Sequence, residues 1–217
     1  MGDLRRASVL FLICIHSSAG EKPPNASTAL PVVALDLQMT VDVYNGINLS
    51  PDELGRAERE AERIFRYAGI QLRWTAGLLG SNVDNNTPSE TRSPRALQLR
   101  IWSRVAAGKR PSGADTLGFC LSLENGDAVV LADAIQQHAV FGAPDFSDLL
   151  GLAMAHELGH LLLRSAGHSV MGMMRARWTK NMLREDQRGY FRFTADEAES
   201  MRKEVRRRME GDLRSAY

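Results

Sequence analysis

The chain has 217 residues, which is enough for one domain of ordinary size with a sizeable hydrophobic core. Its 27 Lys and Arg residues nearly balance its 26 Asp and Glu residues, so the net charge is only +1. A general nucleic-acid binder needs a net basic surface, and this balance therefore argues against a nucleic acid as partner.

The first 31 residues are expected to precede the folded domain. Two arginines come before a short apolar run over residues 7–15, and small residues follow up to Ala19, as in a secretory signal peptide cleaved after that residue. The run is too short to span a bilayer. We therefore predict a signal peptide over residues 1–19, a linker rich in Pro, Ser and Ala over residues 20–31, and one domain over residues 32–217. The protein should be secreted or periplasmic, with no stable membrane anchor after cleavage.

Cleavage would leave Cys120 as the only cysteine, so no internal disulfide is expected. The apolar neighbours of Cys120 predict a small buried hydrophobe. The stability of the exported domain must then come from packing or from a metal ion.

Hydrophobic patterns divide the domain into strands and helices. Apolar and polar residues alternate over residues 35–43, which predicts a half-buried strand. Ser50 to Glu53 form a capping box with proline at the first helical position, and Gly69 closes the predicted helix. Further strands are predicted over residues 70–74, 97–101, 117–123 and 128–132, with a polar loop over residues 81–94. This order predicts a single mixed α/β (α+β) domain.

A helix over residues 148–163 carries the most informative residues. Apolar side chains cover it on every side, which predicts that it is buried. The only polar side chains in its second half are His156, Glu157 and His160. Burying a carboxylate and two imidazoles without partners would cost several kcal/mol, so something must satisfy them.

The spacing H-E-x-x-H indicates a metal site. Positions i and i+4 lie on the same face of a helix, so the rings of His156 and His160 reach one point. Glu157 can lean over the same cavity and take a proton from a metal-activated water. Two core histidines satisfied by hydrogen bonds are the alternative. However, three of the four histidines outside the predicted signal peptide fall between residues 156 and 168, which favours the metal.

Two classes of third ligand fit these residues. If the chain turns back after the helix, His168 can complete the site, and Ser165 to Gly167 form a natural helix stop. If it does not, a glutamate from a later helix can bind instead, with Glu185 or Glu197 as candidates.

The segment HELGHLLLRSAGHSVMGMMRARW resembles the metzincin metallopeptidases, whose motif H-E-x-x-H-x-x-G-x-x-H precedes a turn that bears a methionine. It is more closely similar to a group of uncharacterised exported bacterial proteins with the pattern H-E-[IL]-G-H-L-L-L…H-S…G-[IM]-M. The resemblance implies a metzincin-like catalytic domain over residues 32–217, with a mixed twisted sheet, an active-site helix, a methionine turn and a C-terminal helix from Thr194. It also implies His156, His160 and His168 as Zn²⁺ ligands, Glu157 as catalytic base and Met174 as the structural turn methionine, with Met171 and Met173 as neighbouring candidates.

The sequence also departs from the metzincin pattern. The motif's glycine is replaced by Leu163, and seven residues rather than five separate His160 from His168. Ala176 stands where some metzincins have a tyrosine ligand. The return loop should therefore be wider than in the family.

The expected function is that of an exported zinc-dependent endopeptidase acting on peptides or proteins, an activity that rests on the resemblance. The resemblance also makes residues 117–123 the candidate edge strand for pairing with an extended peptide. A glutamate-ligand zinc hydrolase and a non-catalytic, zinc-stabilised binding module are the alternatives. His138 is a weak candidate for contact with the site, and Asp133 and Tyr190 are candidate supporting groups.

Overall fold

The computed structural model describes residues 14–16, 37–77, 96–108, 113, 115–139, 145–179, 182–183 and 191–213, with the side chains of residues 14–16 and 211–213 excepted. The predicted linker, the polar loop over residues 81–94, Glu185 and Tyr190 lie outside the described residues, as does most of the predicted signal peptide. Within the described part of the chain, no helix is long and apolar enough to cross a membrane.

A five-stranded mixed sheet forms the centre of the fold. Its strands are β2 (Leu37–Asn45), β3 (Ile70–Ala76), β4 (Leu97–Trp102), β5 (Gly118–Ser122) and β6 (Asp127–Leu131), in the spatial order β3-β2-β4-β6-β5. The first four strands of this order pair in parallel, and β5 pairs antiparallel with β6. The mixed α/β fold class is thus confirmed. So are the interior position of β6 and the edge position of β5 within this sheet.

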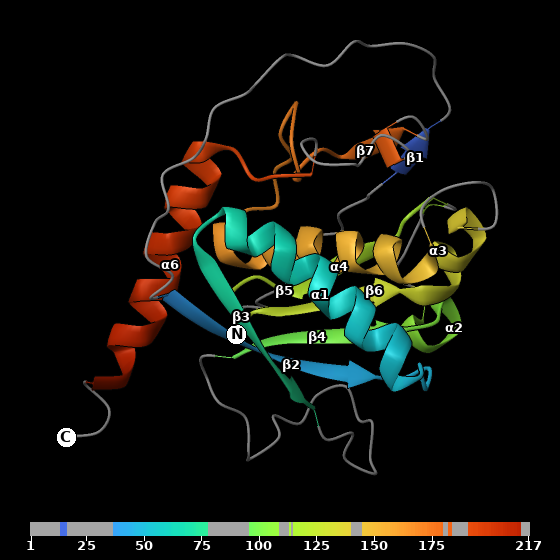
Figure 1. The fold of residues 1–217 in the computed structure, drawn as a ribbon, viewed down its shortest axis with the longest axis horizontal. Helices are drawn as coiled ribbons and strands as arrows, with labels where there is room; N and C mark the ends of the chain where they lie inside the picture. Colours follow the sequence, from blue (N-terminus) through green and yellow to red (C-terminus); the bar gives the residue numbers. More distant parts are fainter. Residues whose placement is uncertain are drawn as a thin grey trace, which may run out of the picture.

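Two helices cover one face of the sheet, and the hydrophobic core lies between them and the strands (Figure 1). They are α1 (Pro51–Tyr67) and α4 (Phe146–Leu163). The predicted capping box of α1 is present, since Ser50 Oγ accepts from Glu53 N and Glu53 accepts from Ser50 N. The helices approach closely at Gly151, where an added Cβ would lie 2.5 Å from the Ala57 carbonyl oxygen.

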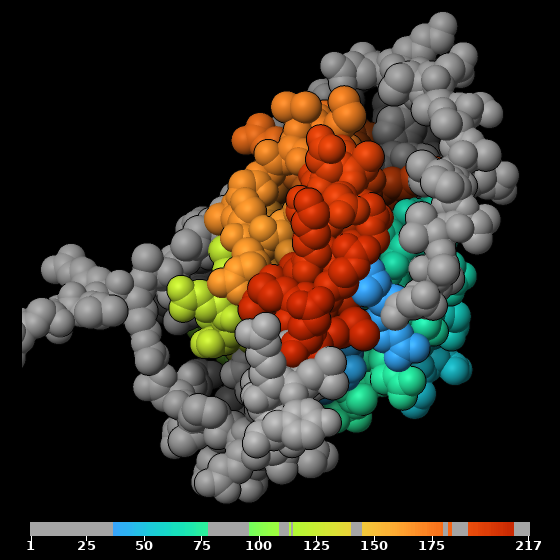
Figure 2. All heavy atoms as spheres, turned by 90° about the vertical axis from the view of Figure 1, so that its left-hand side faces the viewer, coloured from blue at the N-terminus to red at the C-terminus, as the bar shows by residue number. Residues whose placement is uncertain are grey.

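Three further helices that the structure describes are α2 (Arg104–Ala107), α3 (Ala132–Ala139) and α6 (Ala195–Leu213). Figure 2 shows α6 on the surface, with the orange segment of residues 145–179 on one side and blue and green residues of the 37–77 segment on the other. The predicted capping box at its start is also present, because Thr194 N donates to Glu197 Oε2 (2.8 Å) and Glu197 N donates to Thr194 Oγ1 (3.2 Å).

A second, two-stranded parallel sheet joins β1 (Cys14–His16) to β7 (Arg177–Thr179). Because β1 falls within the predicted signal peptide, a chain cleaved after Ala19 would lack it. Cleavage itself stays a prediction.

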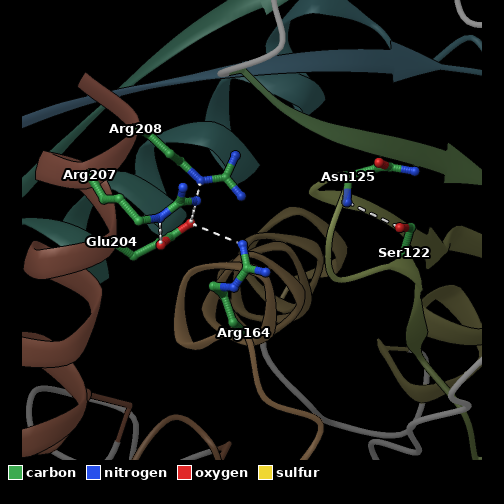
Figure 3. A network of polar contacts seen from close by, with 6 residues as sticks. All are labelled: Ser122, Asn125, Arg164, Glu204, Arg207 and Arg208. Atoms are coloured by element: carbon green, nitrogen blue, oxygen red, sulfur yellow. Dashed lines mark hydrogen bonds and ion pairs between the residues drawn. The ribbon is translucent and has the colours of Figure 1, made fainter. Parts of the chain in front are cut away.

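Helix α4 ends at Leu163, as predicted, but the residue that turns the chain is not the expected Gly167. Arg164, directly after the helix, takes the left-handed conformation at φ 49° and ψ 32°. Gly167 does not have a positive φ. Figure 3 shows how Arg164 is held in place: its guanidinium lies 3.7 Å from the carboxylate of Glu204 on α6, where Arg207 and Arg208 also converge. A tertiary ion pair therefore accompanies a conformation that local sequence would assign to glycine.

Candidate metal centre

Helix α4 brings His156 and His160 together, as their spacing predicts. Both side chains are completely buried, and their Nε2 atoms lie 3.0 Å apart. His168 comes from the segment after the helix, and its ring centroid lies 5.3 Å from that of His156 and 4.9 Å from that of His160. One nitrogen from each of the three rings lies within 4.8 Å of the others. The chain therefore does turn back after α4 far enough to join the third histidine to the first two.

Backbone carbonyls fix the tautomers of the two helix histidines. His156 Nδ1 lies 2.9 Å from the carbonyl oxygen of Met173, and His160 Nδ1 lies 2.9 Å from that of Ser165. A carbonyl oxygen can only accept a hydrogen bond, so Nδ1 carries the proton in each ring and Nε2 presents a lone pair. This arrangement is the usual way in which a metal-binding histidine is oriented.

Two lone pairs facing each other at 3.0 Å repel unless a cation lies between them. A proton is a poor candidate for that cation, because burial lowers the pKa of His160 to about 4 and that of His156 well below its usual value. At neutral pH both rings are therefore neutral ligands. The three histidines can bind a metal ion. A shared cation would also remove the repulsion between the Nε2 lone pairs of His156 and His160.

The side chain of Glu157 lies against the edge strand β5. Its side chain is completely buried, and its Oε2 lies 3.7 Å from Cys120 Sγ. Gly118 makes room for it, since an added Cβ there would lie 2.7 Å from Glu157 Oε1. Burial raises the pKa of the Glu157 carboxyl well above its usual value. Such a perturbed carboxyl beside a metal site is typical of a catalytic base.

The contacts of Gly118 and Cys120 with Glu157 were missed by the sequence reasoning. Cys120 is buried, as predicted, but it is also in contact with the candidate base. The predicted strand already indicated that Gly118 and Cys120 lie on the same face, because residues two apart on a strand share one face. The sequence around them does not indicate which helix packs against that face.

The side chain of Met174 packs against the site helix α4. An added Cβ at Gly159, between the two helix histidines, would lie 2.6 Å from Met174 Sδ. Met173 is also buried and supplies the carbonyl that holds His156, whereas Met171 is exposed. Ser169 N donates to the Met174 carbonyl at 2.8 Å and closes the turn, and Gly172 has a φ of 74° within it. The ring of Trp178, from β7, packs edge-on against His156.

Glu197 has a structural role beside the third histidine. Its carboxylate accepts from Thr194 N in the helix cap and from the hydroxyl of Ser169, the residue that follows His168. It thereby ties the start of α6 to the turn. Both carboxylate oxygens are engaged in these contacts, which disfavours Glu197 as a metal ligand.

The weaker candidates do not join the cluster. His138 is not among the three histidines whose nitrogens come together in the described part of the chain. Asp133 accepts from the backbone N–H of Arg104 and Ala134, so it supports the junction of α2 and α3.

Comparison of the chain with protein-family models found no match, and comparison with curated proteins found none either. The metzincin resemblance therefore remains an expectation.

Proposed function

We propose that the protein is an exported zinc-dependent endopeptidase with a metzincin-like fold. The observation that carries the proposal is the pair of oriented Nε2 lone pairs of His156 and His160, together with His168, beside a buried glutamate. Three protein ligands with a carboxylate next to them are typical of catalytic zinc sites, which leave the fourth position open.

The donor set fits zinc. Two nitrogens bound to one tetrahedral zinc ion at ~2.1 Å lie about 3.4 Å apart. The Nε2 atoms of His156 and His160 are 3.0 Å apart, and one nitrogen of His168 lies within 4.8 Å of the ligand nitrogens of both. Imidazole ligands also suit other first-row metals, so the choice of zinc rests on the resemblance.

Zinc in such a site supplies Lewis acidity to a water molecule and to a substrate carbonyl. Glu157 accepts the proton of the attacking water and passes it to the leaving amine. Burial alone raises the pKa of the Glu157 carboxyl. The positive charge of a zinc ion nearby would favour the ionised carboxylate, which is the form that can accept a proton. The two backbone carbonyls keep the imidazoles in the ligating tautomer throughout.

A peptide substrate is supported by the edge strand. Among the strands that the structure describes, β5 pairs with β6 alone. Leu117 accepts a hydrogen bond from Leu131 N, so by alternation the N–H groups of Gly118 and Cys120 face away from β6. An extended peptide can add to such an edge. The same strand contacts Glu157, so a paired peptide would run past the candidate base.

Two rival functions fit the site less well. In a glutamate-ligand hydrolase, Glu185 or Glu197 would replace His168, but Glu197 is engaged in its helix cap. A non-catalytic, zinc-stabilised binding module would have no use for a buried carboxylate at position 157 and would usually fill the fourth position with protein.

The decisive experiment measures hydrolysis of a mixed quenched-peptide library, with and without chelator, together with metal content. The parent protein should bind about one equivalent of zinc and cleave peptides only when loaded. Glu157→Gln should keep the zinc while its activity falls by about 100-fold or more, because the base is lost and no ligand is. Glu199→Gln, an exposed change on α6, is the matched control and should keep full activity. Equal activity in Glu157→Gln and the parent would rule out the mechanism.

A further inference from the structure

The edge strand β5 presents two small residues to the candidate base. Gly118 and Cys120 share one face of the strand, and both lie against the carboxylate of Glu157 on α4. Cys120 Sγ is 3.7 Å from Oε2, within the range for a hydrogen bond to sulfur. Oε1 lies against Gly118 and accepts no hydrogen bond from the part of the chain that the structure describes.

The chemical state of Cys120 suits a donor rather than a nucleophile. Burial, reinforced by the nearby Glu157, raises the pKa of the thiol well above its usual value, so the group stays as S–H. With only 3% of its surface exposed, it is also shielded from oxidants and alkylating reagents. A catalytic or redox role for this thiol is therefore disfavoured.

We propose that Cys120 is a positioning residue for Glu157: its S–H donates to Oε2 and fixes the direction of the carboxylate that serves as base. This inference rests on the proposed function of Glu157. A glutamate on a helix has several side-chain rotamers, and a base must stay within hydrogen-bond reach of the proton that it takes. Strand β5 restricts Glu157 from both sides, since Gly118 leaves room for one oxygen and Cys120 holds the other.

The strand that restricts the Glu157 side chain is also the strand whose free edge could pair with a peptide. The N–H groups of Gly118 and Cys120 face away from β6, so the two residues that restrict the base are also those that would pair with an extended peptide. The register of a bound peptide and the direction of Glu157 are therefore set by the same five-residue strand.

Kinetics of two matched variants separate positioning from packing. If the thiol is a donor, Cys120→Ala should lower kcat about tenfold or more, with KM and zinc content near those of the parent, whereas Cys120→Ser keeps a donor and should stay within about threefold. If Cys120 only fills space, Cys120→Ala should instead be more active than Cys120→Ser, because alanine is tolerated while a buried hydroxyl without a partner is costly. Serine equal to or worse than alanine, in a chain that is active, overturns the proposal.

An infrared measurement tests the contact without any change at Cys120. The S–H stretch of a thiol moves to lower frequency when it donates a hydrogen bond, and protein groups other than thiols barely absorb in that region. The difference spectrum between the parent and Glu157→Leu, which removes both acceptor oxygens, should therefore show a shifted S–H band from Cys120. A flat difference spectrum shows that no such bond exists. If the parent cleaves no peptide, the proposed function and the positioning role fall together, while this band still reports whether the contact exists.

Discussion

Without a bound metal, the stability of the protein should be sensitive to acid, and the histidines of α4 set the size of the effect. In the folded, metal-free protein burial lowers the pKa of His160 to about 4, whereas in the unfolded chain it titrates near its usual value of 6.5. Between these two pH values the unfolded state binds more protons than the folded state. The contribution of His160 to stability is therefore present above about pH 6.5 and is lost as the pH falls toward 4.

The magnitude follows from the difference between the two pKa values. A shift from 6.5 to about 4 is 2.5 pH units, and each unit corresponds to about 1.4 kcal/mol, so His160 alone should remove about 3 kcal/mol from the free energy of unfolding. His156 acts in the same direction, because its pKa is also lowered by burial. A loss of this size is a large part of the stability of an ordinary domain.

Urea unfolding of chelator-treated protein at about pH 7.5 and about pH 4 measures this loss. His160→Leu removes the titrating group, and its pH dependence should be smaller than that of the parent by about 3 kcal/mol. Gln137→Leu, an exposed change on α3 that alters no titrating group, is the control and should keep the parent's dependence. If His160→Leu and the parent respond equally to acid, the imidazole is not held neutral by burial, and the argument for a metal between the two Nε2 atoms loses its basis.

Two further predictions concern ligands and packing. His168→Ala should lose tight zinc binding, whereas Glu185→Ala and Glu197→Ala should keep stoichiometric metal by elemental analysis, the latter with a loss of about 1 kcal/mol in stability from its helix cap. The reverse result for His168 and either glutamate would establish the glutamate-ligand class. Gly159→Ala should destabilise the protein by about 1–3 kcal/mol in urea, because its Cβ would meet Met174 Sδ at 2.6 Å and a Phe193 ring carbon at 2.8 Å. Gly55→Ala, where the new Cβ meets only the end of the Arg59 side chain, should instead stabilise α1 by roughly 0.5–1 kcal/mol, and equal effects at both glycines would contradict the packing around Met174.

The sequence determined the parts of this protein that depend on neighbours within about one helical turn or along one strand. Ser50 with Glu53 and Thr194 with Glu197 form the expected capping boxes, because each bond joins residues three apart. The alternating strand predicted over residues 35–43 matches β2 over residues 37–43, and β2 continues to Asn45. The i and i+4 spacing of the helix histidines placed their rings together for the same reason of local geometry.

Only the tertiary structure decided which groups surround that local pattern. Arg164, and not Gly167, turns the chain after α4. Its guanidinium forms an ion pair with Glu204, which lies on α6 forty residues later in the sequence. The carbonyl of Met173 selects the tautomer of His156 across 17 residues, and Cys120 reaches Glu157 across 37. Periodicity tells which face of an element is apolar, but contacts at such separations depend on how the elements pack against each other, and that is set by the shape of the whole core.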